Sequence, residues 1–181
     1  MRTRRILTIA AVAAASLLAV AAPGSTNSST AARCQPSQLH LAASFYGEAG
    51  GQFLQTFTFA SISRQVCRLA GWPSLGIEVG SHRPVPVRTR RVVQGPLDAR
   101  PFASVLLHAR GAASFDVYGA DWDFSRNRSC PRTTAARITP PGGGATLRVG
   151  VKIPNCPGGF LIAPLIAGRS DHQSWSSVWH P

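Results

Sequence analysis

Alternation of apolar and polar side chains is the dominant pattern of this chain, and its central example is the stretch 50–79. After a pair of glycines, the phenylalanines of the stretch fall on one side of an extended chain and the threonines on the other: Phe53, Phe57, Phe59, Thr56 and Thr58. A period of two is typical of a β-strand with one buried face. The stretch then reaches Cys67, turns at Gly71 and continues into a second apolar run. We expect the rest of the domain to be organised around it.

Short apolar runs separated by turn residues recur along the whole chain. Besides the strand that begins at Phe53, the pattern predicts strands at 39–46, 75–79, 102–109, 114–124, 136–139, 146–151 and 160–166. Glycine-rich segments at 47–51 and 140–144 predict two hairpin turns. Pro84 and Pro86 lack backbone donors, which confines 80–91 to a sheet edge or a loop. Because no segment has a helical period, we predict an all-β domain, an antiparallel sandwich rather than a closed barrel.

The amino-terminal residues have the pattern of an export signal. Arg2, Arg4 and Arg5 precede the apolar run 6–22, and 19–21 are small residues suited to signal peptidase. We predict a signal peptide at 1–21, with an uncleaved anchor as the alternative. A flexible leader (22–33), the sandwich domain (34–170) and a tail (171–181) would follow. The protein is then expected to be secreted or associated with the cell envelope, with no stable membrane span after cleavage.

The four cysteines favour two disulfides over a metal site, because disulfides are typical of small exported domains. In an antiparallel hairpin, residues equidistant from the turn lie side by side. The midpoint between Cys34 and Cys67 falls at the first predicted turn, and the midpoint between Cys130 and Cys156 falls at the second. We therefore predict the pairs Cys34–Cys67 and Cys130–Cys156, without a metal or a cofactor.

A set of local motifs resembles a known family of secreted actinobacterial domains of unknown function, number 4232. The motifs are, in chain order, Cys34, the Ala-Gly-Gly of 49–51, the Cys-Arg-Leu-Ala-Gly-Trp-Pro of 67–73, the Arg-Ile-Thr-Pro-Pro of 137–141, Cys156 and the Leu-Ile-Ala-Pro of 161–164. The resemblance extends over about 34–167. It implies an immunoglobulin-like sandwich outside the cytoplasm, and it implies no known activity.

Charge is the other unusual property of the chain. Lys and Arg number 19 against 7 Asp and Glu, a formal charge of +12, and removing the predicted signal with its three arginines lowers it to +9. Such a surface attracts anionic polymers and membranes. The densest basic stretch contains Arg83, Arg88, Arg90 and Arg91, which would suit phosphate or carboxylate ligands if they shared a face. We expect an anionic envelope polymer or an envelope protein as the partner, and no nucleic acid, because the chain carries an export signal.

No catalytic motif is evident in the sequence. The segment around Ser74 lacks the spacing of a nucleophile elbow. Asp121 and Asp123 alternate across Trp122, an arrangement that could serve an acid–base pair or calcium. We therefore expect a binding module without enzymatic activity. The alternative is an envelope hydrolase in which the fold brings Asp121, Asp123 and His108 together.

Overall fold

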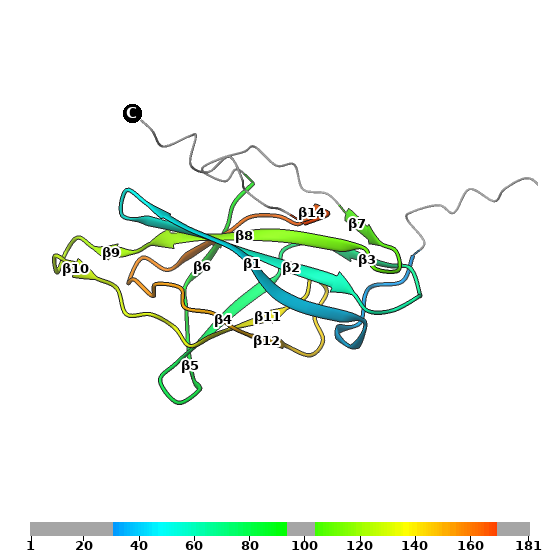
Figure 1. Cartoon of the computed structure of the whole chain (residues 1–181), viewed down its shortest axis with the longest axis horizontal. Helices are drawn as coiled ribbons and strands as arrows, with labels where there is room; N and C mark the ends of the chain where they lie inside the picture. The colour runs from blue at the N-terminus through cyan, green and yellow to red at the C-terminus, as the bar shows by residue number, and fades with distance from the viewer. Residues whose placement is uncertain (1–30, 94–103, 170–181) are drawn as a thin grey trace, which may run out of the picture.

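The protein is a sandwich of β-sheets (Figure 1). The computed structural model describes residues 31–93 and 104–169, and within these ranges the helical content is one short 3-10 helix, η1 (Pro36–Gln38). The predicted signal peptide, most of the predicted leader and the predicted tail lie outside the described residues. In the described part of the chain, no helix is long and apolar enough to cross a membrane.

The upper layer in Figure 1 is a six-stranded sheet, in which β2 and β8 occupy the centre and β1 and β6 the edges. Its strands are β1 (Leu39–Ala49), β2 (Gln52–Ser61), β6 (Thr89–Arg91), β8 (Ala112–Ala120), β13 (Phe160–Ile162) and β14 (Ile166–Ala167). Pairing is antiparallel throughout, except between β13 and β6. Pro164 falls between β13 and β14, where the sequence predicted an interruption.

The lower layer is a four-stranded antiparallel sheet in the order β12, β11, β4, β5. Its strands are β4 (Ser74–Val79), β5 (Arg83–Val85), β11 (Ala135–Thr139) and β12 (Leu147–Gly150). Two small sheets complete the fold: β3 (Cys67–Ala70) with β7 (Ser104–Leu107), and β9 (Trp122–Asp123) with β10 (Arg128–Ser129). The stretch 50–79 thus contributes a central strand to each main sheet.

The core lies between the two main sheets. Phe115 on β8 stacks with Phe57 and Phe59 on β2, with ring centroids 5.5 and 5.6 Å apart. Ile77 on β4 and Ile138 on β11 pack into the same fully buried cluster from the opposite sheet. Two face-to-face sheets around a shared aromatic and aliphatic core confirm the all-β, immunoglobulin-like sandwich predicted from the sequence.

The second face of β2 differs from the prediction. The pattern suggested that Thr56 and Thr58 face solvent, but both are buried. β13 and β14 lie beside β8 in the sheet, on the side opposite β2; between them the Ala163 amide donates to the Asp116 carbonyl, and the Ser114 hydroxyl donates to the Gly168 carbonyl. Because the buried groups on this face are polar, they bond to one another: Thr56 Oγ1 donates to Asp116 Oδ1 at 2.6 Å.

Both predicted disulfides are present, with Cα–Cα distances of 4.8 Å for Cys34–Cys67 and 5.2 Å for Cys130–Cys156. The second extends its hairpin as expected, because the ladder of β11 and β12 continues through the bridge between Arg132 and Pro154. The first arises differently. Cys67 lies on β3, which pairs with β7 and not with β1, and Cys34 reaches it through a short parallel contact in which its amide donates to the Arg68 carbonyl.

Candidate functional site

The four arginines of the predicted basic patch come from two edge strands and the link between them. Arg83 lies on β5 in the lower sheet, and the chain then crosses to the upper sheet, where β6 carries Arg90 and Arg91. Arg91 places its guanidinium over the Trp72 ring, 5.8 Å from the centroid. Arg88 and Arg90 line two adjoining shallow hollows of about 390 and 220 Å³, of which Arg88 lines both. Arg88 and Arg90 are thus the two arginines of the predicted patch that line a common hollow.

A close approach of two backbones holds Arg88 in place. The Phe160 amide donates to the Arg88 carbonyl at 2.9 Å. Gly159 has φ +76°, and a β-carbon on it would stand only 2.4 Å from that carbonyl oxygen. Only glycine fits such a position without a shift of the backbone. The exposed Arg88 side chain therefore projects from a well-defined main chain.

A hollow lies at the left end of the sandwich in Figure 1, where the β1–β2 turn meets the segment between β8 and β9 and the β9–β10 hairpin. Gly50 and Gly51, with φ of +60° and +79°, form the two-residue turn between β1 and β2. Two positive φ angles are typical of a type I′ hairpin turn, which favours glycine. The Asp121 amide donates to the Gly51 carbonyl at 3.0 Å and so joins this turn to the segment between β8 and β9.

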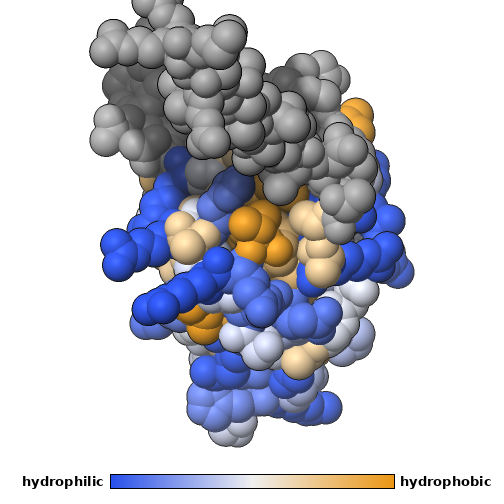
Figure 2. All heavy atoms as spheres, turned by 90° about the vertical axis from the view of Figure 1, so that its right-hand side faces the viewer, coloured by the Kyte–Doolittle hydropathy of each residue, from blue (hydrophilic) through white to orange (hydrophobic). Residues whose placement is uncertain are grey.

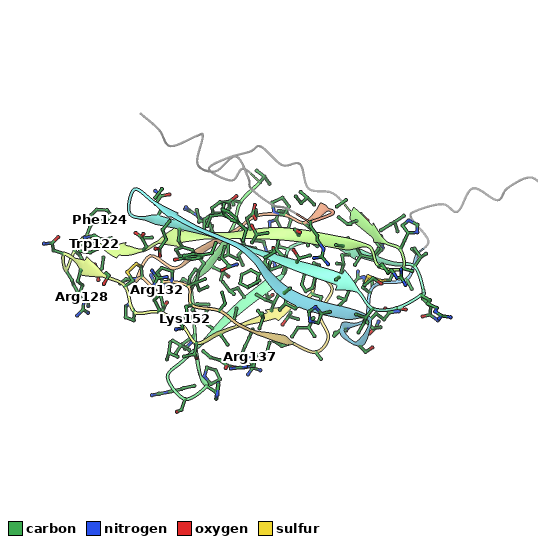
Figure 3. The ribbon with its side chains drawn as sticks, in the orientation of Figure 1. Trp122, Phe124, Arg128, Arg132, Arg137 and Lys152 are labelled. Atoms are coloured by element: carbon green, nitrogen blue, oxygen red, sulfur yellow. A yellow bond between two sulfur atoms is a disulfide. The ribbon has the colours of Figure 1, made fainter. Side chains whose placement is uncertain are left out.

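This hollow, which we call the aromatic hollow, has a volume of about 580 Å³. It is lined by Glu48, Gly50, Gly51, Asp121, Trp122, Phe124, Ser129 and Arg132. Trp122 is 36% exposed and Phe124 76% exposed, and Figure 3 shows both at the outermost end of the molecule beside Arg128. Exposed aromatic rings bordered by a few polar groups are typical of ligand-binding hollows.

An ion pair closes the inner side of the aromatic hollow. Arg132 donates to Glu48 Oε1 at 2.5 Å and to the Tyr46 hydroxyl at 2.8 Å, and its guanidinium lies 5.7 Å from the centroid of the Tyr46 ring. Tyr46 also donates to Glu48. Partial burial and the bond to Glu48 raise the pKa of Tyr46 well above its usual range. Tyr46 therefore stays protonated at neutral pH and serves as a hydrogen-bond donor.

The hairpin of β9 and β10 holds the two exposed rings in place. Asp123 points away from the hollow and accepts hydrogen bonds from the Ser125 hydroxyl at 2.6 Å and from the Ser125 amide at 3.1 Å. Arg126 adds an ion pair to Asp123 at 3.3 Å. The hydrogen bond from the Ser125 hydroxyl is the main cause that lowers the pKa of Asp123. Trp122 and Phe124, on either side of this buried carboxylate, both face the hollow.

The three residues of the hydrolase alternative do not come together. Asp121 borders the aromatic hollow, whereas the Asp123 carboxylate is engaged in its own turn. His108 lies in the turn before β8, at the opposite end of that nine-residue strand. At about 3.3 Å per residue, a strand of this length separates His108 from Asp121 by about 30 Å. Such a separation excludes direct cooperation of these side chains in one reaction.

The disulfide Cys130–Cys156 lies between the hollows. The Cys130 amide donates to the Asp121 carbonyl at 3.0 Å, next to Ser129 of the aromatic hollow. Cys156 itself lines the larger of the two hollows at Arg88. One covalent bond thus connects the walls of both hollows.

Sequence reasoning identified Asp121 but missed the residues that accompany it. The signal that could have pointed to them is the triplet Trp122, Asp123, Phe124, which places two large aromatic side chains on one side of a short strand followed by a polar turn. The partners Glu48, Gly51 and Arg132 come from distant positions. Only the strand register brings them to the same end of the molecule.

Together, the fold and its hollows define a disulfide-linked β-sandwich that presents ligand-sized hollows at one end. The chain belongs to the family described as domain of unknown function (DUF4232), whose model matches residues 34–161. No curated protein and no solved structure matches the chain significantly.

Proposed function

We propose that this protein is a binding module that acts outside the cytoplasm, without catalysis, and holds an anionic ligand at Arg88 and Arg90. The single observation that carries the proposal is the position of these two arginines. Both are exposed, and together they line adjoining hollows whose other walls contain no carboxylate. Guanidinium groups in this setting suit bidentate contacts to phosphate or carboxylate.

The charge of the described surface supports the same reading. Two acidic residues are already paired: Glu78 with Arg148 and Arg137, and Asp123 with Arg126. Arg90 lies on β6 and Arg88 directly before it, whereas Glu78 lies on β4 of the other main sheet. Their charge therefore remains available to a ligand.

Location outside the cytoplasm rests on two further observations. Disulfides persist in oxidising compartments and are rare in the cytosol. The segment 1–21 carries the pattern of an export signal. An anionic polymer or an acidic lipid of the cell envelope is accordingly the class of ligand that we propose.

Binding to defined anions tests the proposal. The full disulfide-bonded chain is mixed with long-chain polyphosphate, with phosphatidylglycerol vesicles or with uncharged phosphatidylcholine vesicles, and the bound fraction is measured by sedimentation or by light scattering. We expect binding to the two anionic probes and a loss of about tenfold or more for the double variant Arg88→Ser/Arg90→Ser, since a charge-assisted hydrogen bond contributes about 1.5–3 kcal/mol. Preference for one probe distinguishes a polymer from a lipid surface.

A matched control variant distinguishes binding at Arg88 and Arg90 from nonspecific electrostatic attraction to the basic surface. Arg64→Ser/Arg169→Ser removes the same charge from two exposed arginines, one between β2 and β3 and the other beyond β14. Raising the salt from about 50 to 200 mM weakens long-range attraction. Under these conditions the control variant should keep nearly all of its affinity for the anionic probes. Equal losses in the two double variants, or no loss in either, would show that Arg88 and Arg90 form no site.

A further inference from the structure

We propose that the aromatic hollow is a second binding site, and that its ligand is the pyranose ring of an uncharged oligosaccharide. This site is independent of Arg88 and Arg90 and goes beyond the function proposed above. The structure provides three arguments for a sugar.

The first argument is the position of the exposed aromatic side chains. Within residues 31–93 and 104–169, the exposed aromatic residues are Tyr46, Trp122 and Phe124. Two of them line the aromatic hollow, and Tyr46 contacts its arginine wall through Arg132. Of the exposed aliphatic residues, Ile62 and Val66 lie at the other end, between β2 and β3, and Val93 follows β6. Figure 2 faces that end and shows a few apolar patches among hydrophilic side chains.

The second argument is the mixed chemistry of the wall. An aromatic face carries partial negative charge and attracts the polarised C–H groups on one side of a pyranose ring. The ring edge carries hydroxyl groups that both donate and accept. Asp121 and Glu48 provide acceptors, Arg132 provides donors, and Ser129 provides a hydroxyl that does both. A sugar ring can thus satisfy the rings and the polar groups at the same time.

The third argument is charge, which disfavours the other occupants. The Glu48 charge is compensated by Arg132, so Asp121 is the uncompensated charge of the wall, with Arg128 on the neighbouring β10. An anion would meet two carboxylates, and a cation would meet the Arg132 guanidinium, which is already paired with Glu48. A purely apolar peptide segment of a partner protein would bury the Asp121 carboxylate without giving it a hydrogen bond, at a large cost in desolvation. An uncharged polyol avoids all three costs.

The walls are held in advance of binding. A β-carbon on Gly51 would stand 3.0 Å from Phe124 Cζ, so the Phe124 ring lies directly against the β1–β2 turn. The Asp123 hydrogen bonds fix the turn that follows Trp122. The disulfide Cys130–Cys156 holds the base of the hairpin. Since these contacts exist without a ligand, little ordering of the chain would oppose binding.

Titration with defined oligosaccharides tests this proposal. Tetramers of β-1,4-linked glucose, of α-1,4-linked glucose and of β-1,4-linked N-acetylglucosamine are each added to the full disulfide-bonded chain, and heat of binding and tryptophan fluorescence are recorded. We expect at least one tetramer to bind, and Trp122→Ala and Phe124→Ala each to weaken it by about tenfold or more. Asp121→Asn should weaken it less, because the amide still accepts a hydrogen bond.

The control is Ile62→Ala, which removes an exposed apolar side chain at the opposite end and should leave the affinity unchanged. Circular dichroism and thermal unfolding verify that each variant is folded, which we expect because both rings are exposed. Arg88→Ser/Arg90→Ser should also bind the tetramer normally, so failure of the anion site and failure of this site are distinguishable.

Three results would overturn the sugar site. The first is that none of the tetramers binds at millimolar concentration. The second is that affinity is unchanged in both Trp122→Ala and Phe124→Ala. The third is that the unmodified chain binds tetramethylammonium, or self-associates as measured by light scattering, and that Trp122→Ala and Phe124→Ala abolish this. The hollow would then be a cation site or an interface between copies.

Discussion

The Phe124 ring rests on the backbone of Gly51, and this contact joins the β9–β10 hairpin to the turn between β1 and β2. A β-carbon at Gly51 would be 3.0 Å from Phe124 Cζ and 3.8 Å from Asp121 Oδ1. Contacts of 3.0 Å between carbon atoms lie well inside the optimal separation. Glycine at this position therefore determines how closely the aromatic ring can approach.

Gly51→Ala should displace Phe124 and strain the turn. Because Gly51 has φ +79°, alanine there costs about 1–2 kcal/mol of the free energy of unfolding, and the contact with the ring adds to this. Urea unfolding measures the change. The comparison is Gly143→Ala, at φ +89°, where a β-carbon meets nothing within 4 Å. Equal destabilisation by the two variants would mean that the contact with Phe124 contributes nothing.

Loss of the disulfide Cys130–Cys156 should destabilise the fold and loosen both hollows. The cysteines are 26 residues apart, and restricting a loop of this length stabilises a protein by about 3–4 kcal/mol in the chain-entropy model. We expect Cys130→Ser/Cys156→Ser to lose about this much in urea unfolding and to bind both ligands more weakly. A variant that retains full stability would show that the hairpin ladder alone holds this end.

Acid should destabilise the lower sheet through Glu78. Its carboxylate is buried and is bonded to Arg148 Nε at 2.9 Å, the main cause that lowers its pKa below the usual 4.5. A lowered pKa in the folded state means that the stabilisation is present above pH 4.5 and is lost as pH falls through the folded pKa.

Unfolding by urea at a series of pH values from about 6 down to 3 measures this loss. Arg148→Met should flatten the pH dependence, since the folded pKa then moves toward its ordinary value. Arg64→Met, on the exposed loop after β2, is the control and should keep the profile of the unmodified protein. If Arg148→Met leaves the slope unchanged, the pair with Glu78 is not its source.

Thr56→Val should destabilise the protein by about 1–3 kcal/mol, because it removes a 2.6 Å hydrogen bond to the buried Asp116 carboxylate. Thr139→Val, which breaks a hydrogen bond to Thr146 near the surface, should cost less than about 0.5 kcal/mol. Thermal unfolding of the two variants provides the test. The reverse order would mean that the hydrogen bond between Thr56 and Asp116 contributes little.

Local pattern predicted much of this fold because turns and strands depend on neighbouring residues. The glycine pair at 50–51, the break at Pro164 and the hairpin ending at Cys130 and Cys156 all depend on such local chemistry. The pairing of Cys34 with Cys67 was also predicted correctly, although β2 ends at Ser61 and Cys67 joins another sheet.

The remaining features depend on contacts between distant residues. Thr56 is buried together with its hydrogen-bond partner Asp116 on β8, and alternation along β2 carries no information about a partner from a distant strand. Arg83 and Arg90 lie on different sheets because the chain changes sheets between β5 and β6. The aromatic hollow likewise assembles residues from the β1–β2 turn, β9, β10 and the segment before β11. No sequence period predicts that convergence.

The edge strands have a consequence for the behaviour of the protein at high concentration. β5 contains Pro84 between Arg83 and Val85, β6 consists of Thr89, Arg90 and Arg91, and β1 is interrupted by a bulge between Ala43 and Phe45. A proline, repelling guanidinium groups and a kinked ladder each oppose the docking of another strand. Copies of the domain that crowd together should therefore resist joining into continuous sheets through these three edges, a safeguard against fibre formation.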